Sequence, residues 1–377
     1  GASASSGGWV NLGIDTVQLK AMEPLPGEEG VSPNHSFSTT TFTDRHNWMR
    51  EAEHERTLAL IRTSPTSGYY VDIFRARSND PREYHDYIYR NVGETFTFTE
   101  TPWDFSLFAT PERFKESADL PWSRNSRYRH PGWHYFMDVS TAESVSDKVS
   151  ARFTMLRMPD GPAAMDVHMN SGANRSYSRA RSPSSRNAPS SYVSSLLHTL
   201  VVRQEGEAWT NPFAFVYESY TTNSPGPSIK SVDQLMEGDA FKGLVVESEV
   251  DGRLIRQYVI NQDDPSTIYR NAVLDMSFSG HFGVVTTTAE GDLLSLYIGD
   301  GDSLRYKETT LTADPVSRSA FQDLSASSPM WLEYGDALGW VEYSEYPYIY
   351  SIKLNGWLYH PYEDLHGDTE SWFYIFK

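Results

Sequence analysis

Histidine and tyrosine side chains alternate near residue 85, in a stretch that could carry out acid–base chemistry. An extended backbone over Tyr84–Arg90 (YHDYIYR) would place His85, Tyr87 and Tyr89 on one face. Histidine and tyrosine are common general acids and bases, so these three side chains are candidate catalytic residues facing a cleft. The alternative is that the same side chains pack in a protein core.

A divalent metal is a second chemical possibility. His54 and Asp72 could meet across neighbouring strands, and His85 would complete a set of two histidines and one carboxylate that suits a metal such as Zn²⁺. The aspartates of Ile298–Asp302 (IGDGD) could instead bind Ca²⁺, although Asp-Gly is equally typical of a tight hairpin turn. A structural Zn²⁺ or Ca²⁺ is therefore the cofactor to consider. In the competing interpretation, Asp72 forms a structural pair with Arg75.

Arginine, histidine and tryptophan side chains could contact an acidic sugar. Guanidinium groups match the geometry of carboxylate and sulfate, and aromatic rings can stack on flat ligands. The candidate substrate-binding residues are Arg75, Arg90, Arg127, Arg129, Trp133 and His134. A further arginine-rich stretch, Ser171–Ser191, has almost no apolar residue and is expected to be a surface loop or a mobile basic arm.

The composition limits the classes of function. The net charge of -18 argues against general nucleic-acid binding, and it would also repel an acidic polysaccharide outside a local basic patch. The chain has no cysteine, which excludes disulfides and thiolate sites. We find no run of about 18 apolar residues, so no membrane span is expected.

Short strands must position these side chains. Aromatic and β-branched residues occur in brief runs separated by Gly, Pro, Asn and Asp, a pattern typical of a β-sandwich. The expected strands are Tyr69–Arg75, Thr95–Thr99, Trp133–Val139, Ala151–Leu156, His198–Arg203, Phe213–Glu218, Gly243–Glu247, Gly283–Thr287 and Asp292–Ile298.

Helix signals are few. Arg45–Ile61 has the composition of a helix, but it could also be a polar approach to a strand at Thr57–Thr63. Ser231–Glu237 is expected to form one or two helical turns that begin at a serine cap.

The last part of the chain repeats a Trp/Tyr unit, as in Trp331–Tyr334 and Gly339–Tyr343. Each unit is expected to be a short strand whose aromatic face needs its neighbours. The repeat resembles small modules at the ends of secreted and surface proteins of marine bacteria. It could serve for packing, or for binding sugar by stacking.

The stretch Glu55–Gly93 resembles heparinase II/III-like polysaccharide lyases. The residues that match the pattern of that family are Arg56, Tyr70, Asp72, Phe74, Arg75, His85, Asp86 and Tyr87. A Gly-Gly turn of the family is replaced by Ser78-Asn79, and a His-Gly by Arg90-Asn91. Weaker matches, in the same order as in the family, extend the resemblance over roughly residues 45–310.

The resemblance implies an all-β protein built as a large antiparallel β-sandwich, in which residues 1–44 join a sandwich of residues 45–325 and residues 330–377 form the aromatic module. In such lyases a separate helical toroid supplies most of the catalytic groups, and the chemistry is β-elimination on a uronate in an acidic polysaccharide such as alginate, ulvan or a glycosaminoglycan. No toroid is recognisable here, so the resemblance implies the sandwich portion of a lyase, with a toroid and an acidic polysaccharide as partners. A non-catalytic carbohydrate-binding or surface-attachment protein is the alternative. Either function implies a secreted, periplasmic or cell-surface location.

Overall fold

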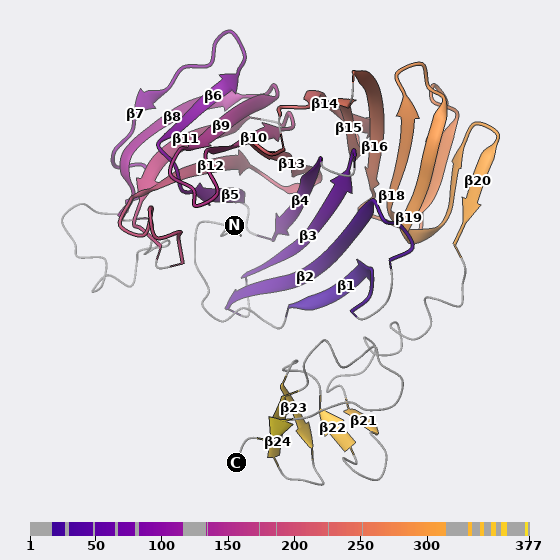
Figure 1. The fold of residues 1–377 in the computed structure, drawn as a ribbon. Helices are drawn as coiled ribbons and strands as arrows, with labels where there is room; N and C mark the ends of the chain where they lie inside the picture. Colours follow the sequence, from indigo (N-terminus) through magenta and orange to yellow (C-terminus); the bar gives the residue numbers. More distant parts are fainter. Residues whose placement is uncertain are drawn as a thin grey trace.

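The structure is a computed structural model that confirms the predicted all-β fold. It describes residues 17–26, 30–47, 50–64, 67–79, 83–115, 133, 135–172, 174–185, 187–224, 226–250 and 252–313, and five short strands between residues 331 and 375. No α-helix occurs in these residues, and neighbouring strands pair antiparallel (Figure 1). No helix that could span a membrane occurs among them either.

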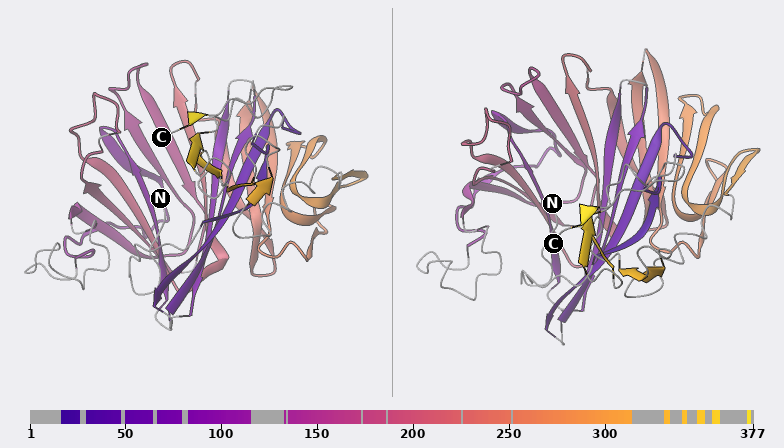
Figure 2. Two further views of the ribbon diagram at one scale, coloured as in Figure 1. Left: turned by 90° about the horizontal axis from the view of Figure 1, so that it is seen from below. Right: turned by 60° about the horizontal axis from the view of Figure 1, so that its bottom comes forward.

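A central sheet connects the two halves of the sandwich. Its strands follow the order β1 (Gln18–Glu23), β2 (His35–Asn47), β3 (Arg50–Arg62), β4 (Gly68–Ser78), β13 (Ala208–Thr221), β10 (Ala163–Met169), β9 (Val149–Met155) and β6 (Thr95–Glu100). In Figures 1 and 2 the strands β2–β4 lie between two further sheets, one on each side.

The cover sheet lies over one part of the central sheet. Its strands follow the order β5 (Tyr84–Asn91), β12 (Leu197–Glu205), β11 (Arg175–Ser182), β8 (Met137–Val145) and β7 (Phe108–Ala109).

The outer sheet packs on the opposite face of the central sheet. Its strands follow the order β14 (Ile229–Glu237), β15 (Ala240–Val250), β16 (Arg253–Asn261), β18 (Met276–Thr288), β19 (Leu293–Tyr306) and β20 (Thr309–Thr312), and β17 (Ile268–Asn271) also pairs with β18.

A fourth, terminal sheet follows later in the chain. Its strands are β21 (Trp331–Glu333), β22 (Trp340–Glu342), β23 (Tyr348–Ser351), β24 (Gly356–Tyr359) and β25 (Tyr374–Ile375).

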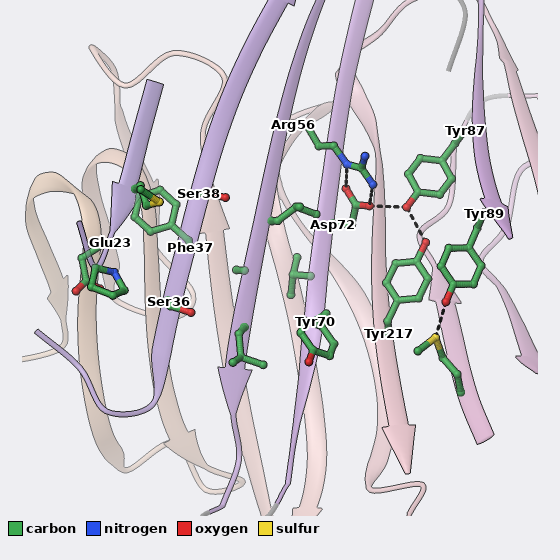
Figure 3. Close-up of a pocket in the computed structure, with 17 residues that line it drawn as sticks. Glu23, Ser36, Phe37, Ser38, Arg56, Tyr70, Asp72, Tyr87, Tyr89 and Tyr217 are labelled. Atoms are coloured by element: carbon green, nitrogen blue, oxygen red, sulfur yellow. Dashed lines mark hydrogen bonds and ion pairs between the residues drawn. The ribbon is translucent and has the colours of Figure 1, made fainter. Parts of the chain in front are cut away.

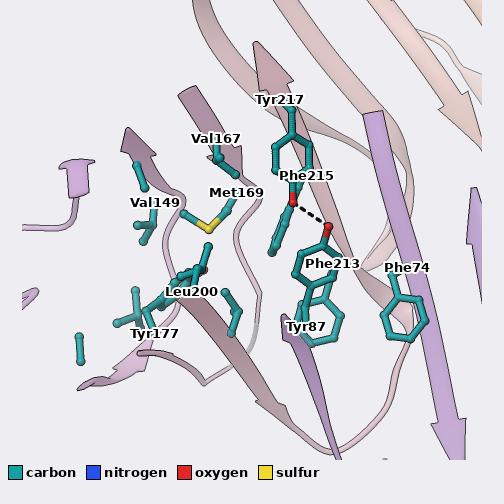
Figure 4. Packing of buried hydrophobic residues seen from close by; sticks show 14 of the residues in the cluster. Phe74, Tyr87, Val149, Val167, Met169, Tyr177, Leu200, Phe213, Phe215 and Tyr217 are labelled. Atoms are coloured by element: carbon teal, nitrogen blue, oxygen red, sulfur yellow. Dashed lines mark hydrogen bonds between the residues drawn. The ribbon is translucent and has the colours of Figure 1, made fainter. Parts of the chain in front are cut away.

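Strand alternation gives the central sheet two buried faces. On β13, Phe213 and Phe215 pack under the cover sheet, whereas Ala214 and Val216 between them pack against the outer sheet. Figure 4 shows the core under the cover sheet, where Phe74 of β4 joins these rings. The two cores are therefore separated by one layer of backbone.

The helix prediction for Ser231–Glu237 was wrong, and for Arg45–Ile61 the strand alternative holds rather than the helix. Arg45–Ile61 lies in β2 and β3. Its buried positions include the polar residues Glu55 and Thr57, so the sequence lacks the regular apolar alternation by which a strand is usually predicted. Ser231–Glu237 lies in β14, whose pairing with β15 shifts register twice. Ile229 and Val232 are buried in the core against the central sheet and Leu235 in a separate core, so buried residues recur three apart, as in a helix.

Two loop predictions also need correction. Ser171–Ser191 contains the strand β11, and its Arg175 is completely buried, with its guanidinium donating to Asn170, Gln204 and the carbonyl of Pro212. The IGDGD stretch lies inside β19 rather than at a hairpin turn. Among the expected strands, Trp133–Val139 begins too early, since β8 starts at Met137.

Candidate functional site

An open groove of about 570 Å³ lies where the cover sheet stops and the central sheet continues (Figure 3). The cover sheet ends at its edge strand β5, and the central strands β1–β4 extend beyond it. The face that is buried under the cover sheet is therefore open over these strands. Exposed strands form the floor of the groove, and β5 contributes to its wall.

Cross-strand pairing arranges the floor in two rows. In the first row Ser38 of β2 pairs with Leu58 of β3, which pairs with Asp72 of β4. In the second row Ser36 pairs with Leu60, Leu60 with Tyr70, and Tyr70 with Tyr217 of β13.

The floor is partly apolar and accessible. Leu58, Leu60 and Tyr70 are 45%, 36% and 51% exposed, whereas the next residue along β4, Val71, is completely buried against the outer sheet. The floor therefore combines small hydroxyl side chains with an aliphatic and aromatic surface.

An ion pair and two tyrosines form the inner end of the groove. Arg56 donates from Nε and Nη2 to the two carboxylate oxygens of Asp72, at 2.9 and 2.5 Å. The Tyr87 hydroxyl donates to Oδ2 of Asp72, and it lies 2.6 Å from the Tyr217 hydroxyl. Because Tyr87 gives its only proton to Asp72, Tyr217 is the donor to Tyr87.

Tyr87, Tyr89 and Tyr217 of the groove are held in the protonated form. Burial, reinforced by the charge of Asp72, raises the pKa of Tyr87 well above its usual value. Burial and the neighbouring Tyr87 do the same for Tyr217, and burial raises the pKa of Tyr89. For Arg56, burial alone would lower the pKa, but the hydrogen bonds and charge of Asp72 raise it overall.

The groove therefore presents protonated tyrosines to a ligand, but among the described residues that line it there is no available base. Among its described lining residues, the only carboxylates are Asp72 and Glu23. Asp72 is paired as above, and Glu23 accepts from the Tyr297 hydroxyl and from the Val31 amide. The lining contains no histidine and no lysine.

The predicted catalytic residues are only partly brought together at the groove. His85, Tyr87 and Tyr89 share one face of β5, as expected, and Tyr87 and Tyr89 line the groove. His85 is completely buried away from it, and its Nε2 lies 2.7 Å from Glu83. Tyr89 is more accessible than Tyr87, and its hydroxyl donates to the Met165 sulfur.

Two predicted substrate-binding residues are buried instead. Arg75 lies on the opposite face of β4 from Asp72, completely buried between the central and outer sheets. It therefore cannot form the expected pair with Asp72, which Arg56 forms instead. Trp133 is buried and stacks on Phe136.

The other predicted substrate-binding residues lie away from the groove or cannot be placed. Arg90 is exposed, but it lies over the Phe136 ring, on the face of β5 opposite Tyr89. Arg127, Arg129 and His134 lie outside the described residues.

The predicted metal ligands do not converge. His54 is buried with its ring stacked on Phe42, its ring centroid is 6.4 Å from that of His85, and Asp72 is paired with Arg56. In the described part of the chain no group of three or more His, Cys, Asp or Glu side chains is placed to hold one metal ion.

The floor residues were not predicted from the sequence. A short signal was present, because His35–Ser38 (HSFS) alternates aromatic and hydroxyl side chains with a period of two. Pairing this strand with β3 would have placed Ser36 and Ser38 beside Leu60 and Leu58.

Comparison with known proteins connects the chain with polysaccharide lyases. Residues 229–324 match the family model described as the endo-acting ulvan lyase C-terminal domain, and this range includes every strand of the outer sheet. An endo-acting ulvan lyase of Formosa agariphila is 35% identical over 304 residues, which is 80% of this chain and 35% of the relative. The chain thus spans about a third of the length of the curated relative it matches. Both matches support the predicted relationship to the C-terminal part of a polysaccharide lyase.

Proposed function

We propose that this chain is the β-sandwich part of a heparinase II/III-like polysaccharide lyase that cleaves ulvan by β-elimination. The observation that carries the proposal is the 35% identity with an endo-acting ulvan lyase, which extends over 80% of the chain. The match is longer than residues 229–377, so it must extend beyond the outer sheet into the part of the chain that forms the other sheets. A polymeric substrate of this kind also favours action outside the cytoplasm.

The groove supplies only half of the chemistry. In β-elimination a base removes the proton next to the uronate carboxylate, the bond to the glycosidic oxygen breaks, and an acid protonates that oxygen, leaving a carbon–carbon double bond in the uronate. A protonated tyrosine fits the role of the acid, and Tyr89 is more accessible than Tyr87 and Tyr217, the other two tyrosines of the groove whose pKa is raised. The base and the groups that neutralise the carboxylate must come from elsewhere, and we assign them to a helical toroid partner.

The test compares the chain alone with the chain joined to the region encoded upstream of it. Each protein is incubated with ulvan, and unsaturated product is followed by its near-ultraviolet absorbance. We expect product from the joined protein and none from the chain alone. Absence of product from both would refute the lyase proposal, and product from the chain alone would place the base within these residues.

Substitution of Tyr89 tests the proposed acid within the joined protein. Tyr89→Phe keeps the ring and removes the proton, and we expect kcat to fall about 100-fold with little change in KM. Tyr135→Phe, at an exposed tyrosine that does not line the groove, is the matched control and should leave kcat unchanged. Equal kcat for Tyr89→Phe and the unmodified protein would remove Tyr89 from the mechanism.

A non-catalytic carbohydrate-binding protein is the second candidate. The observation that favours it is the groove itself, which offers hydroxyl and apolar surface without an available base. Retention of the chain by ulvan in an affinity gel, with no product from the joined protein, would support this alternative.

A further inference from the structure

We propose that the groove binds the uncharged face of a sugar unit, and that the unit carrying the carboxylate lies outside it. This inference rests on the proposed function and specifies which part of the polysaccharide the groove holds. Three features carry it: the chemistry of the floor, the charge of the lining and the position of the protonated tyrosine.

The floor matches a sugar ring that presents hydroxyls and C–H groups. Ser36 and Ser38 are partly exposed and can each donate and accept a hydrogen bond. Beside them, Leu58, Leu60 and the half-exposed ring of Tyr70 form one apolar surface. An apolar sugar face can lie on this surface while the hydroxyls at its edge reach the serines (Figure 3).

The lining does not suit a carboxylate or a sulfate. Arg56 is its only described cation, and the side chain already makes two hydrogen bonds to Asp72. Asp72 and Glu23 contribute two negative charges against this one positive charge. An anionic group in the groove would therefore meet net repulsion, added to that of a chain whose net charge is -18.

The position of Tyr89 specifies which sugar unit occupies the groove. The oxygen that leaves in β-elimination stays on the unit next to the uronate. If Tyr89 protonates this oxygen from the groove wall, the leaving unit lies on the floor of β2–β4 and the uronate extends beyond the groove.

The experiment measures binding of ulvan to the intact chain by affinity gel electrophoresis at about 50 mM and about 500 mM NaCl. We expect retention that does not weaken at the higher salt concentration, because Arg56, the one cation among the described lining residues, is paired with the Asp72 carboxylate. Tyr70→Ala should weaken binding about tenfold, whereas Tyr70→Phe should bind as the unmodified chain does.

A pair of leucines gives the matched control. Leu60→Ala removes floor surface and should weaken binding, whereas Leu254→Ala, a similarly exposed leucine of the outer sheet, should have no effect. Circular dichroism of each variant confirms that the sheets are intact.

Three outcomes would overturn the inference: no retention of the chain, retention that falls steeply with salt, or retention unchanged in both Tyr70→Ala and Leu60→Ala. These outcomes are distinct from failure of the lyase proposal, which depends on product formation by the joined protein. A lyase whose chain binds ulvan only through salt-sensitive contacts would refute this inference and leave the proposed function intact.

Discussion

At the scale of single residues, the hydrogen-bonded chain of Tyr217, Tyr87 and Asp72 fixes the inner end of the groove. Removing the Tyr87 hydroxyl takes a donor from a buried carboxylate, so Tyr87→Phe should lower the free energy of unfolding by about 2 kcal/mol. Tyr217→Phe removes only a bond between neutral hydroxyls and should cost about 1 kcal/mol or less. Urea unfolding of both variants measures the difference, and equal losses would contradict this assignment of donors.

Buried histidines make the fold sensitive to acid. Burial lowers the pKa of His54 and of His281 from 6.5 to about 3, and that of His35 to about 4. The folded protein keeps these rings neutral, whereas the unfolded chain takes up protons below pH 6.5. Stability should therefore be full above this pH and decline as the pH falls towards 3 to 4.

One variant isolates the contribution of His54. The ring lies between Phe42 and Phe74, so His54→Phe replaces it with an aromatic ring that does not titrate. Thermal unfolding at about pH 4.5 and about pH 7.5 should show a smaller loss on acidification for this variant than for the unmodified chain. An identical loss would show that His54 does not contribute to the acid sensitivity.

At the residue scale, the sequence predicts which side chains share one face of a strand. It does not predict which neighbouring strand or sheet that face contacts. The shared face of His85, Tyr87 and Tyr89 followed from a period of two. The same period places Arg75 on the opposite face of its strand from Asp72, but it does not identify Arg56 as the partner of Asp72, because that contact depends on the pairing of β3 with β4.

At the scale of elements, a buried arginine connects the central and outer sheets. Arg75 of β4 donates to the backbone and side-chain oxygens of Asn261 on β16 and to the carbonyl of Trp209. Arg75→Met leaves these oxygens without their donor and removes the cation that lies 3.8 Å from the buried Glu55, and we expect a loss of about 3 kcal/mol.

Arg77 provides the control on the same strand. Its side chain is half-exposed and pairs with Glu53, so Arg77→Met should cost about 1 kcal/mol or less. Denaturant unfolding of the two variants tests the expectation. Similar losses would mean that the buried arginine contributes no more than a surface ion pair.

Strands rich in apolar side chains could be predicted from the sequence, whereas strands that bury polar side chains could not. Phe213–Glu218 was expected to be a strand because its residues are aromatic and β-branched, and it is part of β13. The strand β11 was missed because its sequence is rich in arginine and serine, a composition typical of a loop. Arg175 is nevertheless buried, because it donates to Gln204 and to the carbonyl of Pro212, which are distant in sequence.

At the scale of the whole molecule, the central sheet should make the two cores unfold together. Its strand β13 supplies Phe213 and Phe215 to one core and Ala214 and Val216 to the other. Loss of packing on one face therefore loosens the backbone that supports the other.

Native-state hydrogen exchange can measure this coupling. Phe74→Ala in the core under the cover sheet should cost about 3 kcal/mol. Protection of the Val246 and Val284 amides in the outer sheet should fall by a similar amount. Unchanged protection at these amides would show that the two halves unfold independently.

The arrangement of the central sheet also bears on how binding preference can change. Over the groove, each floor strand has one face in a core and one in solvent. The residues that pack in the core therefore alternate along the strands with five floor residues, Ser36, Ser38, Leu58, Leu60 and Tyr70. These five positions can be randomised with little loss of stability, since none supplies a side chain to either core. Related proteins could thus change which polysaccharide they bind through a few substitutions at these floor positions, while the residues of the two cores stay the same.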